Sequence, residues 1–183
     1  TENGYSSENT FVTGMSNGGD MSYMLACQAD EIFKAIAPIA GCMMEDIYNT
    51  CSPNPIPIFE IHGTADGVTL WNGDMENNDG WGSYLSTLDG ISFWVEQNEC
   101  QNSEEIQGPA LNTIHHRYFD CMDNTEVWLY EIMGGGHDWP AYSSQEIWSF
   151  FSQFIPSGDI NNDGSINIQD IIVLINIILE SNF

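Results

Sequence analysis

Residues 10–19 read Thr-Phe-Val-Thr-Gly-Met-Ser-Asn-Gly-Gly and place Ser16 between glycines at the end of a short apolar run. Residues 14–18 match the Gly-x-Ser-x-Gly pattern, in which a sharp strand-to-helix turn lifts a serine hydroxyl above the edge of a sheet. Such a turn brings two backbones close together, so its flanking positions favour glycine. Residues 10–12 favour a buried strand, and residues 20–28 favour the helix that follows. The stretch therefore predicts a strand, a turn that carries a nucleophilic serine, and a helix.

Apolar runs and helical patterns alternate along the rest of the chain. The expected strands span residues 36–40, 56–61, 112–119 and 126–133, and the expected helices span residues 85–97 and 143–154. Ser143 and Glu146 have the spacing of a capping box. We expect loops at residues 42–55 and 67–83. The order of elements predicts an α/β architecture with functional groups at the carboxyl ends of the strands.

The chain has 183 residues and an extreme charge, because Lys34 and Arg117 are its only basic residues beside 27 acidic ones, for a net charge of -25. A chain of this charge repels phosphate backbones, so nucleic-acid binding is excluded as a function class. Most of the acidic residues are expected on a solvated face, and the composition suits calcium or a salty medium. No apolar run is long enough for a membrane span.

Five cysteines leave at least one unpaired if disulfides form. We expect Cys100 to pair with Cys121, because these residues flank a polar insert whose ordering a covalent link would favour. Cys42 with Cys51 is a second, weaker pairing, and Cys27 is expected as a small buried thiol beside apolar residues. None of the cysteines has zinc-ligand spacing. Disulfides would place the protein in an oxidising, extracellular setting.

Three residue types needed for nucleophilic catalysis follow expected strands. A serine hydroxyl needs a base to remove its proton, and the base needs an acid that orients it. Ser16, Asp66 and His137 supply the three groups in the chain order Ser, Asp, His. His137 is then the general base and Asp66 its orienting acid. The backbone N–H of Asn17 is the expected oxyanion donor, and no cofactor is needed for the catalysis.

Other residues compete for these roles. His62 is the rival base, although its position before Asp66 favours a structural hydrogen bond, and Asp74 is the rival acid. His115 and His116 lie in an expected strand, so one is expected to face inward and the other outward, with a metal role less favoured than packing. Trp139 is the best candidate for a substrate-binding residue, because it lies two residues from the proposed base, and Trp71 is a second candidate. Simple packing is an equal alternative for both tryptophans, and also for Trp81.

Several spaced motifs together resemble one family. They are VTGMSNGG (12–19), LAC (25–27), AIAPIAG (35–41), IHGTAD (61–66) and GGGHDWP (134–140). This set resembles secreted esterases of the polyhydroxybutyrate depolymerase and feruloyl esterase group within the α/β-hydrolases. The resemblance covers about residues 9–155.

The resemblance implies Ser16, Asp66 and His137 as the triad. It also implies carboxylic ester substrates, namely feruloyl or acetyl esters of plant polysaccharide or a polyester of the polyhydroxyalkanoate type. Cysteines near Cys100 and Cys121 also fit the family. Members of the family carry several strands before the serine turn, and one following loop supplies a second oxyanion donor. We therefore expect this chain to hold the C-terminal part of the doubly wound sheet, with the N-terminal strands missing.

The tail carries a second, separate signal after a break at residues 156–158. Oxygen donors recur at positions 1, 3, 5, 9 and 12 of a twelve-residue loop, with glycine at position 6 and a carbonyl ligand at position 7, which is the spacing of a calcium loop. The expected ligands are Asp159, Asn161, Asp163, Ser165, Asn167 and Asp170. With the apolar helix expected at residues 168–179, the loop resembles one repeat of a dockerin, which implies a cohesin-type partner.

We therefore expect two domains, an α/β-hydrolase esterase domain at residues 1–156 and a dockerin-like calcium-binding repeat at residues 157–183. The leading hypothesis is a secreted serine esterase. A second hypothesis is a non-catalytic module whose role is calcium-dependent anchoring. A third is peptidase activity on the same fold, which the esterase-like motif set disfavours.

Overall fold

A computed structural model of the protein describes residues 10–155, 158–161 and 165–180. The expected polar lead-in at residues 1–9 and the expected domain boundary at residues 156 and 157 lie outside the described residues. Within the described part, no helix is long and apolar enough to cross a membrane.

Six strands form one mixed sheet in the order β1-β2-β3-β6-β5-β4. The strands are β1 (Phe11–Met15), β2 (Ala35–Ile39), β3 (Ile58–Gly63), β4 (Asn102–Gln107), β5 (Thr113–Phe119) and β6 (Val127–Ile132). β1, β2, β3 and β6 run parallel, whereas β4 and β5 are antiparallel to their neighbours. The carboxyl ends of the four parallel strands therefore meet at one edge of the sheet, where functional groups are expected.

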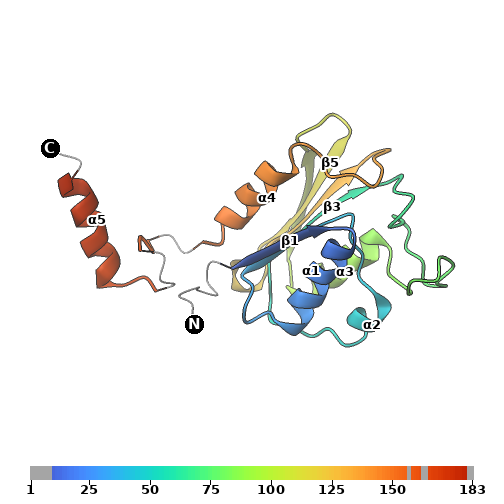
Figure 1. Cartoon of the computed structure of the whole chain (residues 1–183), viewed down its shortest axis with the longest axis horizontal. Helices are drawn as coiled ribbons and strands as arrows, with labels where there is room; N and C mark the ends of the chain where they lie inside the picture. Colours follow the sequence, from blue (N-terminus) through green and yellow to red (C-terminus); the bar gives the residue numbers. More distant parts are fainter. Residues whose placement is uncertain (1–9, 156–157, 162–164, 181–183) are drawn as a thin grey trace.

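Helices cover both faces of the sheet (Figure 1). The α-helices of the described residues are α1 (Asn17–Gln28), α2 (Glu45–Tyr48), α3 (Thr87–Gln97), α4 (Ser143–Ser152) and α5 (Ile168–Glu180), of which α1 and α3 cover one face of the sheet and α4 the other. Tyr23 of α1 and Trp94 of α3 belong to one apolar cluster with Ile58 of β3. Phe150 of α4 belongs to a second cluster with Phe59 of β3. Successive residues of a strand thus enter opposite cores, and this explains why the central parallel strands β2 and β3 are mostly apolar.

The expected strands and helices exist, but several boundaries differ. β1 continues through Met15, and α1 begins at Asn17 rather than at residue 20. α2 interrupts the expected loop at residues 42–55. β4 was not expected at all, because every residue of the strand is exposed and it lacks the apolar alternation that identifies a half-buried strand. Its register is set by pairing with β5.

The predicted capping box of α4 is wrong. Tyr142 occupies the N-cap position, and Ser143 lies inside the helix with its side chain buried. Glu146 does not reach back to the start of the helix, because its carboxylate accepts a hydrogen bond from the Tyr130 hydroxyl of β6 at 2.7 Å. A tertiary contact has replaced the local one that the sequence spacing favoured.

The cysteine prediction is half right. Cys100 and Cys121 form a disulfide as expected. Cys27 pairs with Cys51, so both the expected free thiol at Cys27 and the expected Cys42–Cys51 bridge are wrong. Cys42 is instead a buried thiol whose backbone N–H and Sγ both contact the Asp20 carboxylate, at 2.8 and 3.3 Å. That contact turns Cys42 toward the first turn of α1 and away from Cys51.

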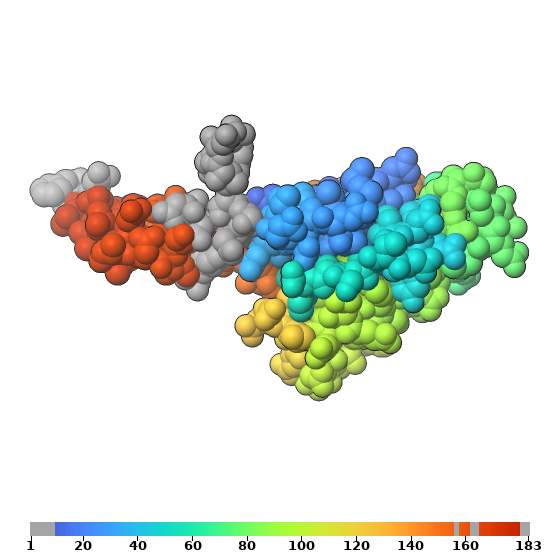
Figure 2. Space-filling view, turned by 90° about the horizontal axis from the view of Figure 1, so that it is seen from below, coloured from blue at the N-terminus to red at the C-terminus, as the bar shows by residue number. Residues whose placement is uncertain are grey.

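The expected helix of the tail is confirmed as α5. Figure 1 shows α5 apart from the sheet, and the space-filling view agrees (Figure 2). Most of its apolar side chains are exposed, namely Ile168, Ile171, Ile172, Leu174, Ile175, Ile177, Ile178 and Leu179.

Candidate active site

Ser16 lies directly after β1 in a strained conformation. Its dihedral angles are φ 57° and ψ -125°, a region that side-chain-bearing residues rarely adopt. The surrounding backbone holds it there, because its N–H donates to the Ile39 carbonyl at 2.9 Å and its own carbonyl accepts from the N–H groups of Gly19 and Asp20. Strain of this kind persists only where the structure over-determines it, and it is concentrated at functional sites.

Two glycines permit the close approach that this turn needs. A Cβ atom at Gly14 would lie 2.6 Å from the backbone of Gly18, and one at Gly19 would lie 2.7 Å from the Cα of Gly41. Neither distance is tolerable for a side chain, since the opposing atoms are backbone. The predicted steric role is thus confirmed for Gly14 of the Gly-x-Ser-x-Gly stretch and extends to Gly19 just beyond it, whereas a Cβ atom at Gly18 would meet nothing within 4 Å.

Asp66 follows β3 and is 5% exposed. Its Oδ1 atom accepts hydrogen bonds from the backbone N–H groups of Val68 and Thr69, at 2.8 and 3.0 Å. Its Oδ2 atom lies 2.8 Å from Nδ1 of His137. The loop backbone thus fixes the carboxylate while one oxygen remains directed at the imidazole.

Contacts between the two loops place His137 beside Asp66. The N–H of Ala65 donates to the Gly135 carbonyl at 2.9 Å, and the N–H of Gly134 donates to the Thr64 hydroxyl at 2.8 Å. These bonds join the loop after β3 to the loop after β6, its neighbour in the sheet. The Asp66–His137 contact is therefore set by two strands that are about 70 residues apart in sequence.

His137 also lies near the turn that carries Ser16. Burial raises the pKa of Asp20. The hydrogen bonds from Cys42 and the charge of His137 lower this pKa, but their effect is smaller than that of burial. Asp20 is in the first turn of α1, the helix that follows Ser16. In the part of the chain that the structure describes, no hydrogen bond joins the Ser16 hydroxyl to His137. Ser16 follows β1 and His137 follows β6, and these parallel strands end at the same edge of the sheet.

Asn17 is the first residue of α1, so its backbone N–H has no acceptor within the helix and remains available to a ligand. Trp139 is 42% exposed and lines a hollow of about 390 Å³ with residues of β1 and α4. Trp71 is less accessible, since its ring packs edge-on against His62 with 5.8 Å between centroids. Of the two candidate substrate-binding tryptophans, Trp139 therefore has the more accessible ring.

The rival residues have other partners. Asp74 accepts hydrogen bonds from the Asn78 amide and the Asp79 N–H, at 2.7 and 3.1 Å. His62 is buried between Glu60 and the Thr69 carbonyl. Neither residue contacts His137, so Asp66 is the carboxylate that the structure places beside it.

The two histidines of β5 face opposite ways, as expected. His115 is buried between the rings of Trp128 and Tyr130. His116 contacts Glu131 at 2.8 Å and Glu105 at 3.4 Å. Among the described residues, no group of three or more His, Cys, Asp or Glu side chains could hold a metal ion.

Sequence reasoning missed Glu60, which lies fully buried in β3 and accepts a hydrogen bond from the Tyr23 hydroxyl at 3.1 Å. The sequence could have pointed to Glu60 through its position, because the other residues of 56–61 are apolar or proline. A lone carboxylate within a buried strand must find partners in the folded state.

Solved structures resemble the sheet and its helices. SOBER1 from Arabidopsis thaliana matches 85% of this chain and 57% of its own, with a TM-score of 0.55 at 16% identity. An acetyl xylan esterase from Aspergillus awamori matches 82% of this chain and 62% of its own, with a TM-score of 0.54 at 17% identity. The fold is that of an α/β-hydrolase. At these identities the likeness establishes the α/β-hydrolase fold and nothing further.

Curated relatives of this α/β-hydrolase chain include feruloyl esterase B of Piromyces equi, 28% identical over 149 residues, which are 79% of this chain and 27% of the relative. A probable feruloyl esterase C of Aspergillus clavatus is 42% identical over 133 residues, 70% of this chain and 41% of the relative. The chain thus spans less than half the length of these relatives. No family model matches it.

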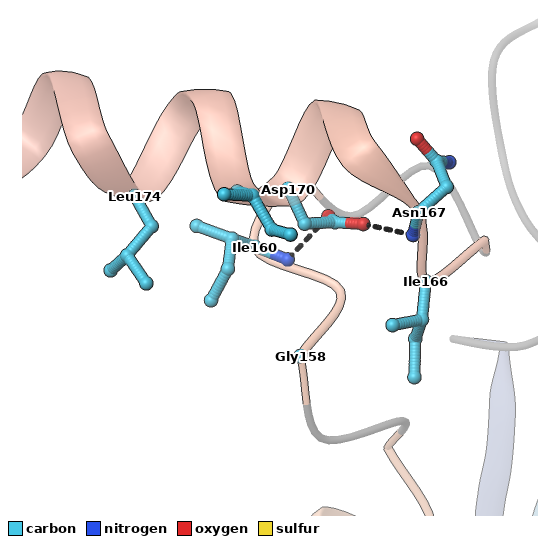
Figure 3. Close-up of a pocket in the computed structure, with 7 residues that line it drawn as sticks. Gly158, Ile160, Ile166, Asn167, Asp170 and Leu174 are labelled. Atoms are coloured by element: carbon cyan, nitrogen blue, oxygen red, sulfur yellow. Dashed lines mark hydrogen bonds between the residues drawn. The ribbon is translucent and has the colours of Figure 1, made fainter.

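Outside the α/β-hydrolase sheet, the expected calcium loop is partly described. Asp163 lies outside the described residues. Asp170 closes the rest of the loop, because its Oδ1 atom accepts from the N–H groups of Ile160 and Asn161, at 2.7 and 3.2 Å, and its Oδ2 atom accepts from that of Asn167 at 2.7 Å (Figure 3). These bonds lower the pKa of Asp170, and the Asn167 bond has the largest effect.

The closed loop borders an apolar groove of about 430 Å³. Figure 3 shows Ile160, Ile166 and Leu174 beside Asp170, at the start of α5. Three N–H groups of the expected loop, at positions 2, 3 and 9, are thus gathered around the carboxylate at position 12.

Proposed function

We propose that this chain carries the catalytic residues of a serine carboxylic-ester hydrolase. Ser16 is the nucleophile, His137 the general base and Asp66 the residue that orients and stabilises the imidazole. The observation that carries the proposal is the strained turn at Ser16 on the same sheet edge as the 2.8 Å contact between Asp66 and His137. Strand, turn and helix in this conformation are typical of a nucleophile elbow.

The proposed reaction proceeds through an acyl-enzyme. His137 removes the proton of Ser16 as the oxygen attacks the ester carbonyl, and it then protonates the leaving alcohol. The Asn17 N–H donates to the oxyanion that forms in between. Water, activated by His137, releases the acid and restores the Ser16 hydroxyl. Asp66 remains ionised throughout and stabilises the imidazolium form of His137.

We propose feruloyl or acetyl esters of plant polysaccharide as substrates, on the strength of the feruloyl esterase relatives. The exposed ring of Trp139 near the proposed base suits stacking against an aromatic acyl group or a sugar. Trp71 is a second candidate contact. A polyester of the polyhydroxyalkanoate type remains the alternative substrate, and comparing hydrolysis of methyl ferulate, acetylated xylan and the polyester distinguishes the three.

We further propose that the protein is secreted. Two disulfides, Cys27–Cys51 and Cys100–Cys121, support an oxidising environment. The net charge of -25 is consistent with an extracellular protein that does not bind nucleic acid.

The test is covalent labelling with a fluorophosphonate probe, followed by peptide mapping. We expect the label on Ser16, and no label on the Ser16→Ala variant with an unchanged circular dichroism spectrum. A folded, unlabelled wild-type protein would contradict the proposal. Turnover of amide substrates above that of matched esters would favour the peptidase alternative instead.

A second function, calcium-dependent anchoring by a separate tail domain at residues 157–183, is supported by the closure of the loop around Asp170. The proposed ligands are the carboxylates of Asp159, Asp163 and Asp170, the side chains of Asn161 and Asn167, and the Ser165 carbonyl. An all-oxygen set of this kind suits a hard cation. A cohesin-type protein is the proposed partner of the exposed face of α5.

Calorimetric titration with calcium tests this second proposal. We expect one ion per chain, and loss of binding in the Asp170→Ala variant, with Asp89→Ala, a carboxylate of α3, as the matched control. Heat of binding that is equal in both variants, or a cohesin pull-down that is unaffected by chelator, would contradict it.

A further inference from the structure

A line of buried side chains runs from Asp66 into the core on the side of the sheet that α1 covers. Nε2 of His62 lies 3.6 Å from Oδ2 of Asp66. Nδ1 of His62 lies 2.9 Å from Oε1 of Glu60, whose Oε2 atom accepts from the Tyr23 hydroxyl at 3.1 Å. The four residues are at most 5% exposed. This line does not include Ser16, so the proposed catalytic steps do not account for it.

The direction of one proton follows from the partners of His62. The Thr69 carbonyl, 2.9 Å from Nε2, can only accept, so Nε2 must carry a hydrogen. A second hydrogen lies between Nδ1 and Glu60, on the ring or on the carboxyl group. Either arrangement leaves Nε2–H beside the Asp66 carboxylate. The opposite tautomer would direct a lone pair at two acceptors, which is repulsive.

The two carboxylate oxygens of Asp66 have different partners. Oδ1 is occupied by the N–H groups of Val68 and Thr69. Oδ2 contacts His137 at 2.8 Å and lies 3.6 Å from His62 Nε2, within ion-pair distance. The oxygen that serves the proposed catalytic base is therefore the one that His62 also faces.

Charges on the surrounding elements are consistent with a proton held at this position. Burial disfavours a charged His62, but the hydrogen bond and charge of Glu60, the Thr69 carbonyl and the charge of Asp66 outweigh it, so its pKa is raised. Burial raises the pKa of Glu60, against its bonds to His62, Tyr23 and Gly41. The other titratable groups near this line are Asp20 and Cys42, at the start of α1 and after β2, which act on Tyr23.

We propose that His62 is a positioning residue for the reaction. Held by Glu60 and by the Thr69 carbonyl, to which its Nε2–H donates, it keeps the positive N–H end of the ring 3.6 Å from Oδ2 of Asp66. This charge distribution keeps the oxygen aligned with His137 and limits how strongly the oxygen attracts the proton of His137. This role rests on the proposed esterase function. The competing interpretation is that His62 only stabilises the fold by joining β3 to the Thr69 loop.

The two interpretations differ in what replacement of His62 does to His137. Asparagine places its amide near the position of Nδ1, so His62→Asn keeps a contact with Glu60 and loses the donor beside Asp66. Glutamine extends to the position of Nε2, so His62→Gln restores that donor. A positioning role predicts that the His137 titration and the activity change in His62→Asn and return toward wild type in His62→Gln. A purely structural role predicts no such difference between the two variants.

The first measurement is ¹⁵N NMR of the histidine rings in the 183-residue chain. In the wild-type protein we expect Nε2 of His62 to carry a bonded proton at every pH between 5 and 9. In His62→Asn, the midpoint of the His137 titration should rise by roughly half a pH unit or more, because Oδ2 then attracts its proton more strongly. His62→Gln should return most of the way to wild type. Tyr23→Phe, which removes only the far hydrogen bond, is the matched control and should not shift it.

The second measurement is the pH profile of kcat/KM for methyl ferulate hydrolysis. The acid limb should move to higher pH in His62→Asn by the same amount as the NMR titration. The plateau should fall roughly 10- to 100-fold, the loss expected when a catalytic group is slightly misplaced. His62→Gln should recover most of the plateau, and Tyr23→Phe should retain it.

The outcomes separate this inference from the proposed function. An unprotonated Nε2 in the wild-type protein overturns the inference even if the variants do not fold. Equal His137 titrations in His62→Asn and Tyr23→Phe also overturn it, while fluorophosphonate labelling of Ser16 would still support the esterase. A wild-type protein that neither labels nor hydrolyses esters removes the proposed function, while the NMR titrations still decide whether His62 acts on His137.

Discussion

At the scale of single residues, two carboxylates that the sequence left in competition have different surroundings. Asp66 contacts His137, whereas Asp74 is bonded to its own loop. We expect Asp66→Asn to lower kcat about 10⁴-fold, because an amide in place of Oδ2 favours the wrong imidazole tautomer. Asp74→Asn is the control and should leave kcat within about twofold of wild type. Steady-state hydrolysis of methyl ferulate measures kcat for both variants. An equal loss of kcat in Asp66→Asn and Asp74→Asn would contradict a specific role for the Asp66 carboxylate.

His115 links pH to stability. Burial, aided by the charge of Arg117, lowers its pKa to about 4, although Glu104 and Glu126 oppose the shift. Because the unfolded chain takes up a proton near pH 6.5, the stability from neutral His115 is complete above that pH. It is lost as pH falls toward 4, by about 3 kcal/mol at most.

We expect His115→Phe to flatten this dependence. Phenylalanine fits between Trp128 and Tyr130 without a titratable group, and among the described residues Nε2 of His115 has no hydrogen-bond partner to lose. Urea unfolding at pH 4.5, 5.5 and 6.5 gives the comparison. Equal pH slopes in variant and wild type would contradict the prediction.

Cys42 is expected to be unreactive in the native protein. Burial, with the Asp20 carboxylate beside the thiol, raises its pKa far above the usual range, so little thiolate forms at pH 8. Cys42 of the folded chain should not react with a disulfide reagent such as DTNB. After unfolding in guanidinium, about one equivalent of the reagent's thiolate should be released. Rapid reaction of the folded protein would contradict this assignment.

At the scale of elements, β4 is the clearest case in which tertiary structure decides local structure. Its residues are polar and exposed, and only pairing with β5 orders them. The Cys100–Cys121 disulfide lies just beyond the ends of this pair and closes a loop of 21 residues. We expect the double variant Cys100→Ser/Cys121→Ser to lose about 3 kcal/mol of unfolding free energy.

The other disulfide is the control for that prediction. Cys27–Cys51 closes a loop of 24 residues, so chain entropy predicts a loss of similar size for its double serine variant. Hydrogen exchange should separate the two, because only loss of Cys100–Cys121 should expose the amides of β4. Uniform exchange in both variants would contradict a local role for that disulfide.

At the scale of the whole molecule, charge is the dominant feature. The net charge of -25 makes the compact state repel itself, and with two basic residues few attractive pairs exist to be weakened by salt. We therefore expect the urea midpoint to rise as potassium chloride increases from 0.02 to 0.5 M, because the Debye length falls from tens of Å to a few Å. Choline chloride is the control for specific cation binding, and a midpoint that falls with either salt would contradict the prediction.

The sequence by itself determined the order of most strands and helices in the chain, the turn at Ser16, the Cys100–Cys121 pairing and the candidates for the proposed triad. These features depend on apolar periodicity and on glycines whose steric role is local. Only the tertiary structure decided the pairing of Cys27 with Cys51, the strand β4, and the choice of Asp66 over Asp74. It also joined His62 and Glu60 to Asp66. Each of these depends on contacts between segments distant in sequence, and local spacing carries no information about which partner a side chain meets.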